Sequence, residues 1–159
     1  MKHIKTGQTR SDAKRKWLVM VDDDDYEILS KFNWQVDKYG TVYSHKTDKG
    51  RILIHRYITN CPKDLEVDHI DGNRLNNQKS NLRLVNSSQN KMNRGARKDC
   101  KSGYKGVSWN TKNNNWNARI KTPTTYKHLG VFTTKEKAAE AYNKAAKFYF
   151  GEYAWLNKL

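Results

Sequence analysis

Cysteine is scarce in this chain of 159 residues. Only Cys61 and Cys100 occur, and they stand far apart in the sequence. This excludes a disulfide framework and a four-cysteine zinc site, because both require cysteines at short, paired spacings. A reducing environment is the expected one for a chain of this kind.

Long apolar runs are also missing. No segment approaches the roughly 20 consecutive apolar residues of a membrane span, and the amino terminus lacks the apolar core of a signal peptide. We therefore expect a protein without a membrane partner and with a cytoplasmic location. Hydrophobic residues make up only 36% of the chain, so the core must be modest, and five Trp, nine Tyr and four Phe can pack small sheets.

Acidic residues are few beside the basic ones. The chain has 16 Asp and Glu against 31 Lys and Arg, which gives a net charge of +15. A field of this sign attracts polyphosphate. The excess is uneven, since residues 1–90 carry a net charge of +4 and residues 91–159 carry +11. The carboxyl-terminal part is therefore the better candidate for holding a nucleic-acid duplex, and the alternative is a basic surface without a specific partner.

One stretch in the first half contains groups suited to a metal site. Residues 66–69 predict a short strand that ends in Asp68 and His69, and residues 82–85 predict a second strand before a helix that carries Asn90 in its first turn. Asp68 and Asn90 offer the hard oxygen ligands that Mg²⁺ accepts. His69 is the group whose ordinary pKa lets it take a proton near neutrality. Together they fit phosphodiester hydrolysis, in which a histidine deprotonates water beside a metal ion.

These residues resemble the HNH endonucleases, which have a ββα-metal fold, and especially their homing-endonuclease branch. The pattern covers residues 53–93. The resemblance implies that His69 is the general base and that Asp68 and Asn90 hold Mg²⁺ or Mn²⁺. It also implies that Asn81 holds the loop between the strands so that the histidine points correctly. The alternative for the Asp-His pair is an ordinary surface or hairpin pair without chemistry.

The patterns before this stretch predict supporting structure. Residues 1–16 indicate a loosely ordered basic arm. The elements expected next are a strand at 17–21, a helix at 26–32, strands at 34–36, 41–45 and 51–54, and a short helical segment that ends before Pro62. Four adjacent aspartates at 22–25 are expected to cap the helix rather than bind metal, because like charges on neighbouring residues repel. His55 is expected to be a structural or supporting residue rather than a second base.

A second module is expected after a linker. Residues 17–93 form the predicted nuclease domain, 94–101 the linker and 102–159 the second module. Its expected elements are strands at 104–109, 116–121 and 127–132 and a helix that begins after Thr133 or Thr134 and stops at Gly151. The chain is thus predicted to be α+β: an amino-terminal β-meander and ββα-metal module linked to a three-stranded antiparallel sheet with one packed helix.

The second module resembles the Apetala-type, or ethylene-response-factor, DNA-binding domain over residues 102–157. The matching segments include Gly-Tyr-Lys-Gly-Val, Trp-Asn-Ala-Arg-Ile, Leu-Gly-Val-Phe and Ala-Trp-Leu-Asn. The resemblance implies a sheet that lies in the major groove with the helix behind it. The residues at its groove-facing positions are Lys105, Ser108, Asn110, Arg119, Lys121 and Tyr126. Ser108, Asn110 and Tyr126 stand where the plant domains have arginine, so the plant target sequence does not transfer.

Individual contacts to DNA can be expected from side-chain chemistry. Arg119 is the expected reader of a guanine, since its guanidinium can donate two hydrogen bonds to that base. The side chains expected to contact phosphate are Lys105, Lys112, Lys121 and Lys127. Trp109 and Trp116 could stack on sugar or methyl groups, or one of them could belong to the core.

The sequence therefore predicts a two-module, metal-dependent DNA endonuclease of the homing or free-standing HNH type. The first module cuts double-stranded DNA, and the second finds the site. One metal and one base make one cut per site, so a monomer is expected to nick and a homodimer could break both strands. The main alternative is a sequence-specific DNA-binding regulator that has lost catalysis, and a further one is an RNA-binding protein that stacks aromatic residues on single strands.

Overall fold

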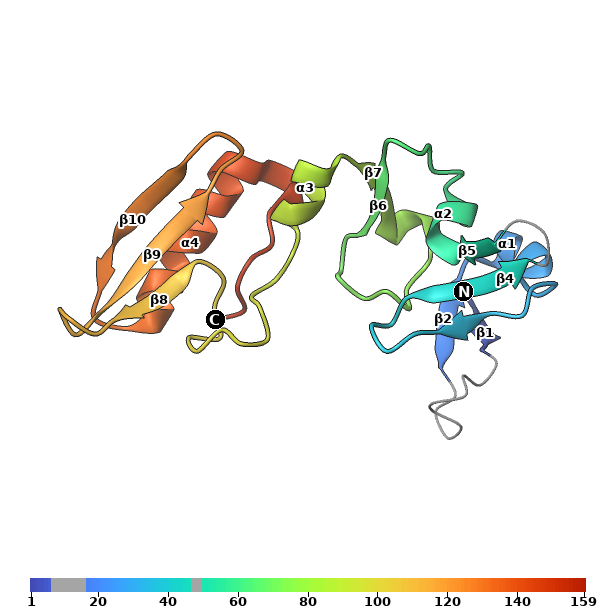
Figure 1. Ribbon diagram of the computed structural model, residues 1–159, viewed down its shortest axis with the longest axis horizontal. Helices are drawn as coiled ribbons and strands as arrows, with labels where there is room; N and C mark the ends of the chain where they lie inside the picture. Colours follow the sequence, from blue (N-terminus) through green and yellow to red (C-terminus); the bar gives the residue numbers. More distant parts are fainter. Residues whose placement is uncertain (7–16, 47–49) are drawn as a thin grey trace. The chain divides into compact units, whose positions relative to one another are not determined.

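The computed structural model describes residues 1–6, 17–46 and 50–159, and the chain divides into two compact units, Met1–Ser87 and Ser88–Leu159. Both units contain helices and antiparallel strands, which form several small sheets (Figure 1), and this confirms the predicted α+β class. Most of the predicted basic arm, residues 7–16, lies outside the described residues, as do residues 47–49 of a predicted turn.

The first unit begins with a two-stranded sheet and a helix. Strand β1 (Lys2–Lys5) pairs antiparallel with β2 (Leu18–Val21), and Ile4 opposite Val19 enters the core. The start of the predicted arm is thus a strand, because Ile4 supplies a buried side chain among the basic residues. Helix α1 (Asp23–Leu29) starts three residues before the predicted position, with three aspartates in its first turn, where the helix dipole favours negative charge.

A short meander follows and completes the core of this unit. Strands β3 (Gln35–Val36), β4 (Val42–Lys46) and β5 (Gly50–Leu53) form a sheet in that order. The indole of Trp34, 1% exposed, donates to the carbonyl of Leu29 at 2.7 Å, so its polar group is satisfied inside the core. Helix α2 (Ile54–Ile58) ends before Pro62, as its sequence predicts.

The last part of the unit is a hairpin with a long loop. Strand β6 (Glu66–His69) pairs antiparallel with β7 (Leu82–Val85), and the short 3₁₀ helix η1 (Lys79–Asn81) leads into β7. Figure 1 shows α2 between β5 and this hairpin. Helix α3 (Ser87–Met92) follows at the point where the two units divide.

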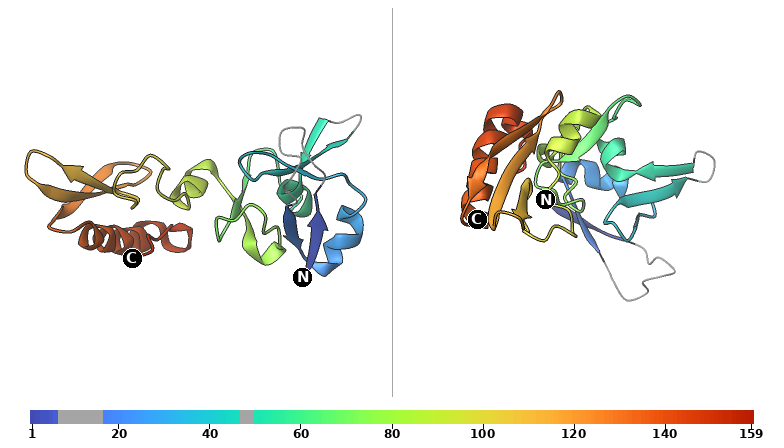
Figure 2. Two further views of the ribbon diagram at one scale, coloured as in Figure 1. Left: turned by 90° about the horizontal axis from the view of Figure 1, so that it is seen from below. Right: turned by 60° about the vertical axis from the view of Figure 1, so that its left-hand side comes forward.

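The second unit is one sheet with one long helix. Strands β8 (Val107–Asn110), β9 (Asn115–Lys121) and β10 (Tyr126–Phe132) form an antiparallel sheet with β9 in the middle. Helix α4 (Lys135–Phe150) covers one face, and the left view of Figure 2 shows it along that side of the sheet. The hydroxyl of Thr134 caps its start, and Gly151, with φ +54°, ends it before η2 (Gly151–Tyr153).

Small residues on α4 let the helix lie close to the sheet. Ala138, Ala139 and Ala146 are completely buried against residues of β8 and β9 such as Val107 and Ala118. Within the described parts of the chain, no helix is long and apolar enough to cross a membrane.

Candidate functional site

Asp68 and His69 are the last two residues of β6, and both side chains are buried. Asp68 lies opposite Arg83 of β7 in the strand register. The Arg83 guanidinium donates to one carboxylate oxygen of Asp68 from Nε at 3.0 Å and from Nη2 at 2.8 Å. The negative charge of this buried carboxylate is therefore compensated from the neighbouring strand.

His69 is held beside a second histidine. Its ring meets that of His55 edge to face, with 5.4 Å between the ring centroids. Its Nε2 lies 3.2 Å from Oδ1 of Asn77. Burial lowers the pKa of His69, and although the Asn77 contact and the Asp71 and Asp68 carboxylates oppose this effect, burial outweighs them. A neutral imidazole able to accept a proton at neutral pH is the consequence.

His55 differs from His69 in its electrostatic surroundings. Burial lowers the pKa of His55 to about 4, and electrostatic coupling to His69, Arg56 and Arg74 acts in the same direction. His55 is thus a neutral packing partner for the His69 ring. That agrees with the supporting role expected for it, which stays a prediction.

The loop between β6 and β7 is tied together by Asn81. The Oδ1 atom of this buried residue accepts from the backbone N–H of Asp71 at 3.0 Å. Its Nδ2 donates to Oδ1 of Asp71 and to the carbonyl of Asn76, both at 2.9 Å. Its own carbonyl accepts from the N–H of Ile70, the residue after His69, at 2.9 Å. Asn81 therefore contacts both ends of the loop that follows the histidine.

Two of the four aspartates after β2, Asp22 and Asp25, take part in the same scaffold. The Asp22 carboxylate accepts from the backbone N–H of Lys79 at 2.8 Å and from Nε2 of Gln78 at 3.2 Å. Asp25 pairs with the Lys79 ammonium at 2.8 Å. Asp22 occupies the helix N-cap position without a side-chain capping bond. These carboxylates hold the start of η1, which carries Asn81.

Asn90 lies on α3, half-buried and in the second unit, so its pairing with Asp68 as a metal ligand stays a prediction. In residues 1–6, 17–46 and 50–159, no cluster of three or more His, Cys, Asp or Glu side chains could hold a metal ion. One carboxylate and one amide oxygen nevertheless suit Mg²⁺, which usually keeps several waters and takes substrate phosphate as a further ligand. The donor types present fit the implied ion.

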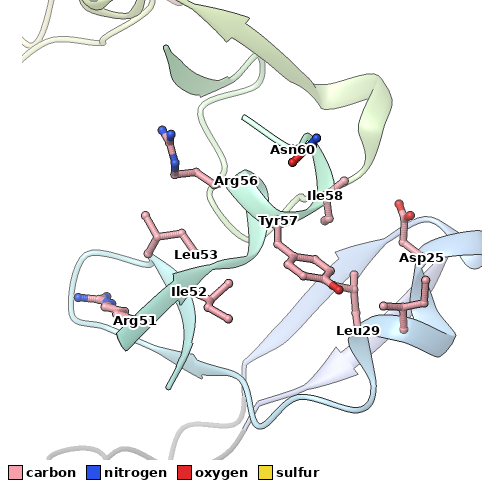
Figure 3. A pocket seen from close by; sticks show the side chains of 10 residues that line it. Asp25, Leu29, Arg51, Ile52, Leu53, Arg56, Tyr57, Ile58 and Asn60 are labelled. Carbon is pink, nitrogen blue, oxygen red and sulfur yellow. The ribbon is translucent and has the colours of Figure 1, made fainter. Parts of the chain in front are cut away.

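A separate groove in the first unit is formed by α1, β5 and α2. It has a volume of about 720 Å³, and Figure 3 shows the Tyr57 ring between the two helices, near Leu29. Arg56 lines it, but its guanidinium donates to the carbonyls of Leu65 at 2.8 Å and Pro62 at 2.6 Å. Arg56 thus fastens the turn that leads into β6.

The strand register of the second unit divides the predicted DNA contacts between two faces. Side chains alternate along a strand, and Ala118 and Ile120 of β9 point toward α4. The opposite, open face therefore carries Ser108, Asn110, Asn117, Arg119, Lys121, Tyr126 and His128. Five of these were expected to contact DNA. Asn117 and His128 were not, and they contact each other, with 3.3 Å between Oδ1 and Nε2.

Three predicted contacts lie on the helix side of the sheet. Trp116 packs against the core, and Trp109 meets it edge to face with 5.0 Å between ring centroids. Lys127 has its ammonium 5.5 Å above the ring of Tyr149 on α4. Lys112 lies in the exposed turn after β8. The two tryptophans and Lys127 therefore do not share a face with Arg119.

Lys105 lies apart from both faces. Its ammonium donates to the carbonyl of Met92, at the end of α3, at 2.7 Å, and burial lowers its pKa to about 8. Met92 itself packs against Ile120 and Phe150 in the core of the second unit. Lys105 therefore fastens the end of α3 within this unit.

Comparison with known proteins agrees with the geometry of the first unit. Residues 52–92 match the HNH endonuclease family. The chain is 38% identical over 142 residues to a protein of Acanthamoeba polyphaga mimivirus named uncharacterized HNH endonuclease, covering 86% of this chain and 72% of that one. It is 41% identical over 59 residues to Protein 3.8 of Escherichia phage T7, covering 37% of this chain and 49% of that one. No solved structure matches the chain.

The buried histidine at the end of β6, the hairpin with its braced loop and these matches define a nuclease. The chain belongs to the HNH endonuclease family and is a DNA endonuclease. The expected enzyme class is thereby confirmed.

Proposed function

We propose that the chain is a metal-dependent, homing-type endonuclease that nicks double-stranded DNA at a site found by its second unit. The observation that carries this proposal is His69, a buried imidazole with a lowered pKa beside the carboxylate of Asp68. A neutral imidazole in this position can take a proton from water at neutral pH.

The residues of the first unit would divide the work as follows. His69 removes a proton from the water that attacks phosphorus. Asn81 holds the loop after His69, so that the ring is oriented before substrate arrives. Asp68 and Asn90 would hold Mg²⁺ or Mn²⁺, which when bound supplies positive charge against the phosphate oxygens and the leaving oxygen. One base and one ion serve one strand, which supports nicking by a monomer, and a homodimer would be needed for a double-strand break.

Recognition is assigned to the open face of the second unit, in the manner of an ethylene-response-factor domain. Arg119 and Lys121 are exposed on it, and the Lys121 ammonium lies 5.1 Å from the ring centroid of its cross-strand partner Tyr126. A cationic face with a donor that suits guanine is what major-groove binding requires. The net charge of +11 over residues 91–159 supports the same assignment.

A plasmid assay tests the proposal. His69→Ala should lower the rate of nicking of supercoiled plasmid by about 1,000-fold and leave DNA affinity almost unchanged, because the imidazole acts in the chemical step. His45→Ala is the matched control, since His45 is an exposed strand residue that packs on Tyr43. Undiminished nicking by His69→Ala would refute the base assignment. Nicking that persists in EDTA would refute metal dependence, and absence of nicking with every divalent ion would favour the inactive regulator.

A further inference from the structure

Asn77 lies in the loop between β6 and β7 and is fully buried, at 0% exposure. Its backbone N–H donates to the carbonyl of Met20 on β2 at 2.8 Å. The N–H of Met20 in turn donates to the carbonyl of Leu75 at 2.8 Å. This part of the loop is thus hydrogen-bonded to a core strand, so the position of the Asn77 side chain is set by the fold.

The orientation of the Asn77 amide is fixed by chemistry as well as by packing. Its Nδ2 lies 3.0 Å from the carbonyl oxygen of Arg74. A carbonyl oxygen only accepts hydrogen bonds, so the amide NH₂ must face Arg74, and the reversed amide would bring two acceptors together. The Oδ1 atom is therefore the atom that faces His69.

This orientation determines which nitrogen of His69 carries the proton. Oδ1 of Asn77 can only accept, and it lies 3.2 Å from Nε2 of His69. In the neutral ring, Nε2 must then be the N–H nitrogen, and Nδ1 holds the lone pair.

We propose that Asn77 is a positioning residue that holds His69 in the Nε2–H tautomer, so that Nδ1 is the nitrogen that takes the proton from the attacking water. The inference rests on the proposed role of His69 as the base. In the step it serves, the water loses a proton to Nδ1, its oxygen forms a bond to phosphorus, and the bond from phosphorus to the 3′ oxygen breaks. The 3′ oxygen leaves with the electron pair of that bond and takes a proton from solvent. The imidazolium that results keeps its bond from Nε2–H to Asn77, which stabilises the positive charge. The proton on Nδ1 then returns to solvent.

Asn77 and Asn81 have separate parts in this arrangement. Asn81 bonds to Asp71 and Asn76 and so shapes the loop, whereas Asn77 contacts the imidazole itself. An orienting partner of a catalytic histidine affects the chemical step far more than the binding of substrate, because the wrong tautomer presents a proton where a lone pair is needed.

The tautomer can be observed directly in the full-length protein. Long-range proton–nitrogen NMR spectra of ¹⁵N-histidine-labelled protein distinguish the protonated from the unprotonated ring nitrogen. The chain has five histidines, and the His69 signals are assigned as those lost in His69→Ala. At about pH 8, where an ordinary histidine is neutral, His69 should be the Nε2–H tautomer. A predominant Nδ1–H tautomer would overturn the inference without the use of any Asn77 variant.

Two variants separate positioning from mere support of the fold. Asn77→Leu keeps the size of the side chain but offers no acceptor, and it should lower kcat about 100-fold with DNA affinity within about twofold. Asn77→Asp keeps an acceptor toward Nε2 but sets an oxygen against the Arg74 carbonyl, so it should lose stability while it keeps the tautomer and most of the rate. A purely structural role predicts the opposite: the two rates would fall in parallel with the melting temperatures.

The control variant is Asn76→Ala. It removes a bond to Asp71 in the same loop but none to His69, so the tautomer and kcat should be retained. The outcomes also separate this inference from the proposed function. If His69→Ala is inactive but wild-type His69 is the Nδ1–H tautomer, the base assignment stands and the role of Asn77 is wrong. If His69→Ala cuts normally, the proposed function fails whatever the tautomer.

Discussion

The two units place their polar residues in opposite ways. In the first unit, Asp68, His69, Asn77 and Asn81 are each at most 8% exposed. Each has a hydrogen-bond partner: Asp68 contacts Arg83, His69 contacts Asn77, and Asn81 contacts Asp71. In the second unit, the charged side chains of the open sheet face, Arg119 and Lys121, are exposed to solvent. The same chain therefore contains buried, hydrogen-bonded polar groups and an exposed, cationic surface.

This difference follows from what each region must do. Proton transfer requires a base fixed within hydrogen-bond reach of water, and a buried network gives that order before substrate binds. Duplex recognition requires side chains that reach outward and exchange solvent for phosphate and base edges. Changes in the second unit should thus alter affinity, and changes in the first should alter the chemical step or its pH response.

The largest expected effect comes from Gly106, the residue before β8. Its φ is +78°, and an added Cβ would overlap the Tyr142 ring and lie 2.5 Å from the carbonyl oxygen of Arg119. Gly106→Ala should therefore destabilise the second unit by about 4 kcal/mol, through backbone strain and overpacking together. Urea denaturation followed by circular dichroism measures the loss, and DNA affinity should fall with it.

Gly103 provides the matched control for this variant. Its φ is +76°, but nothing lies within 4 Å of an added Cβ. Gly103→Ala should cost only the backbone strain, about 1–2 kcal/mol. Equal losses in the two variants would show that the contact with Tyr142 has no energetic weight. If folded Gly106→Ala showed a changed His69 tautomer, the proposed division of roles between the two units would be wrong.

The order of strands and helices was largely predictable from the sequence, because alternating apolar residues and turn formers mark each element. Residues 107–110, 115–121 and 126–132 lie in strands, within a few residues of the predicted spans. The placement of Asp68 and His69 at a strand end was also predictable, since Gly72 and Asn73 follow closely as turn formers. The start of the chain differed, because Ile4 is buried in the core while Lys2 and Lys5 stay exposed in the same strand.

The partners of the candidate site were not predictable in the same way. The position of Arg83 opposite Asp68 follows from the strand register. To predict that register from the sequence, one must know the exact length of the loop between β6 and β7. Asn77 is one of several asparagines in that loop, and its contact with His69 depends on hydrogen bonds to β2, which is distant in sequence. Lys105 donates to the carbonyl of Met92, a group distant in sequence that its long side chain can reach, and its expected phosphate contact stays a prediction.

A smaller effect is expected from the pH response of the first unit. The pKa of His55 is about 4 in the folded chain, below its ordinary value of 6.5, so protonation favours the unfolded state. Stability from this group is complete above pH 6.5 and is lost as the pH falls toward 4. By linkage, the wild-type protein should lose up to about 3 kcal/mol of unfolding free energy through His55 between pH 6.5 and pH 4. His55→Gln should not show this loss. Urea unfolding at several pH values measures it, and parallel curves for the two proteins would contradict the prediction.

The smallest effect should come from single side chains of the sheet in the second unit. Arg119 is on the open face, whereas Lys127 faces α4 and lies over Tyr149. Substituting each cation in turn therefore compares the contributions of the two sheet faces to DNA binding. Arg119→Ala should weaken DNA binding by about 1–3 kcal/mol, while Lys127→Ala should change it by less than about 0.5 kcal/mol. Fluorescence anisotropy with duplex DNA measures both, and nicking at saturating protein should be normal. Similar losses for both variants would mean that net charge, rather than one face of the sheet, holds the DNA.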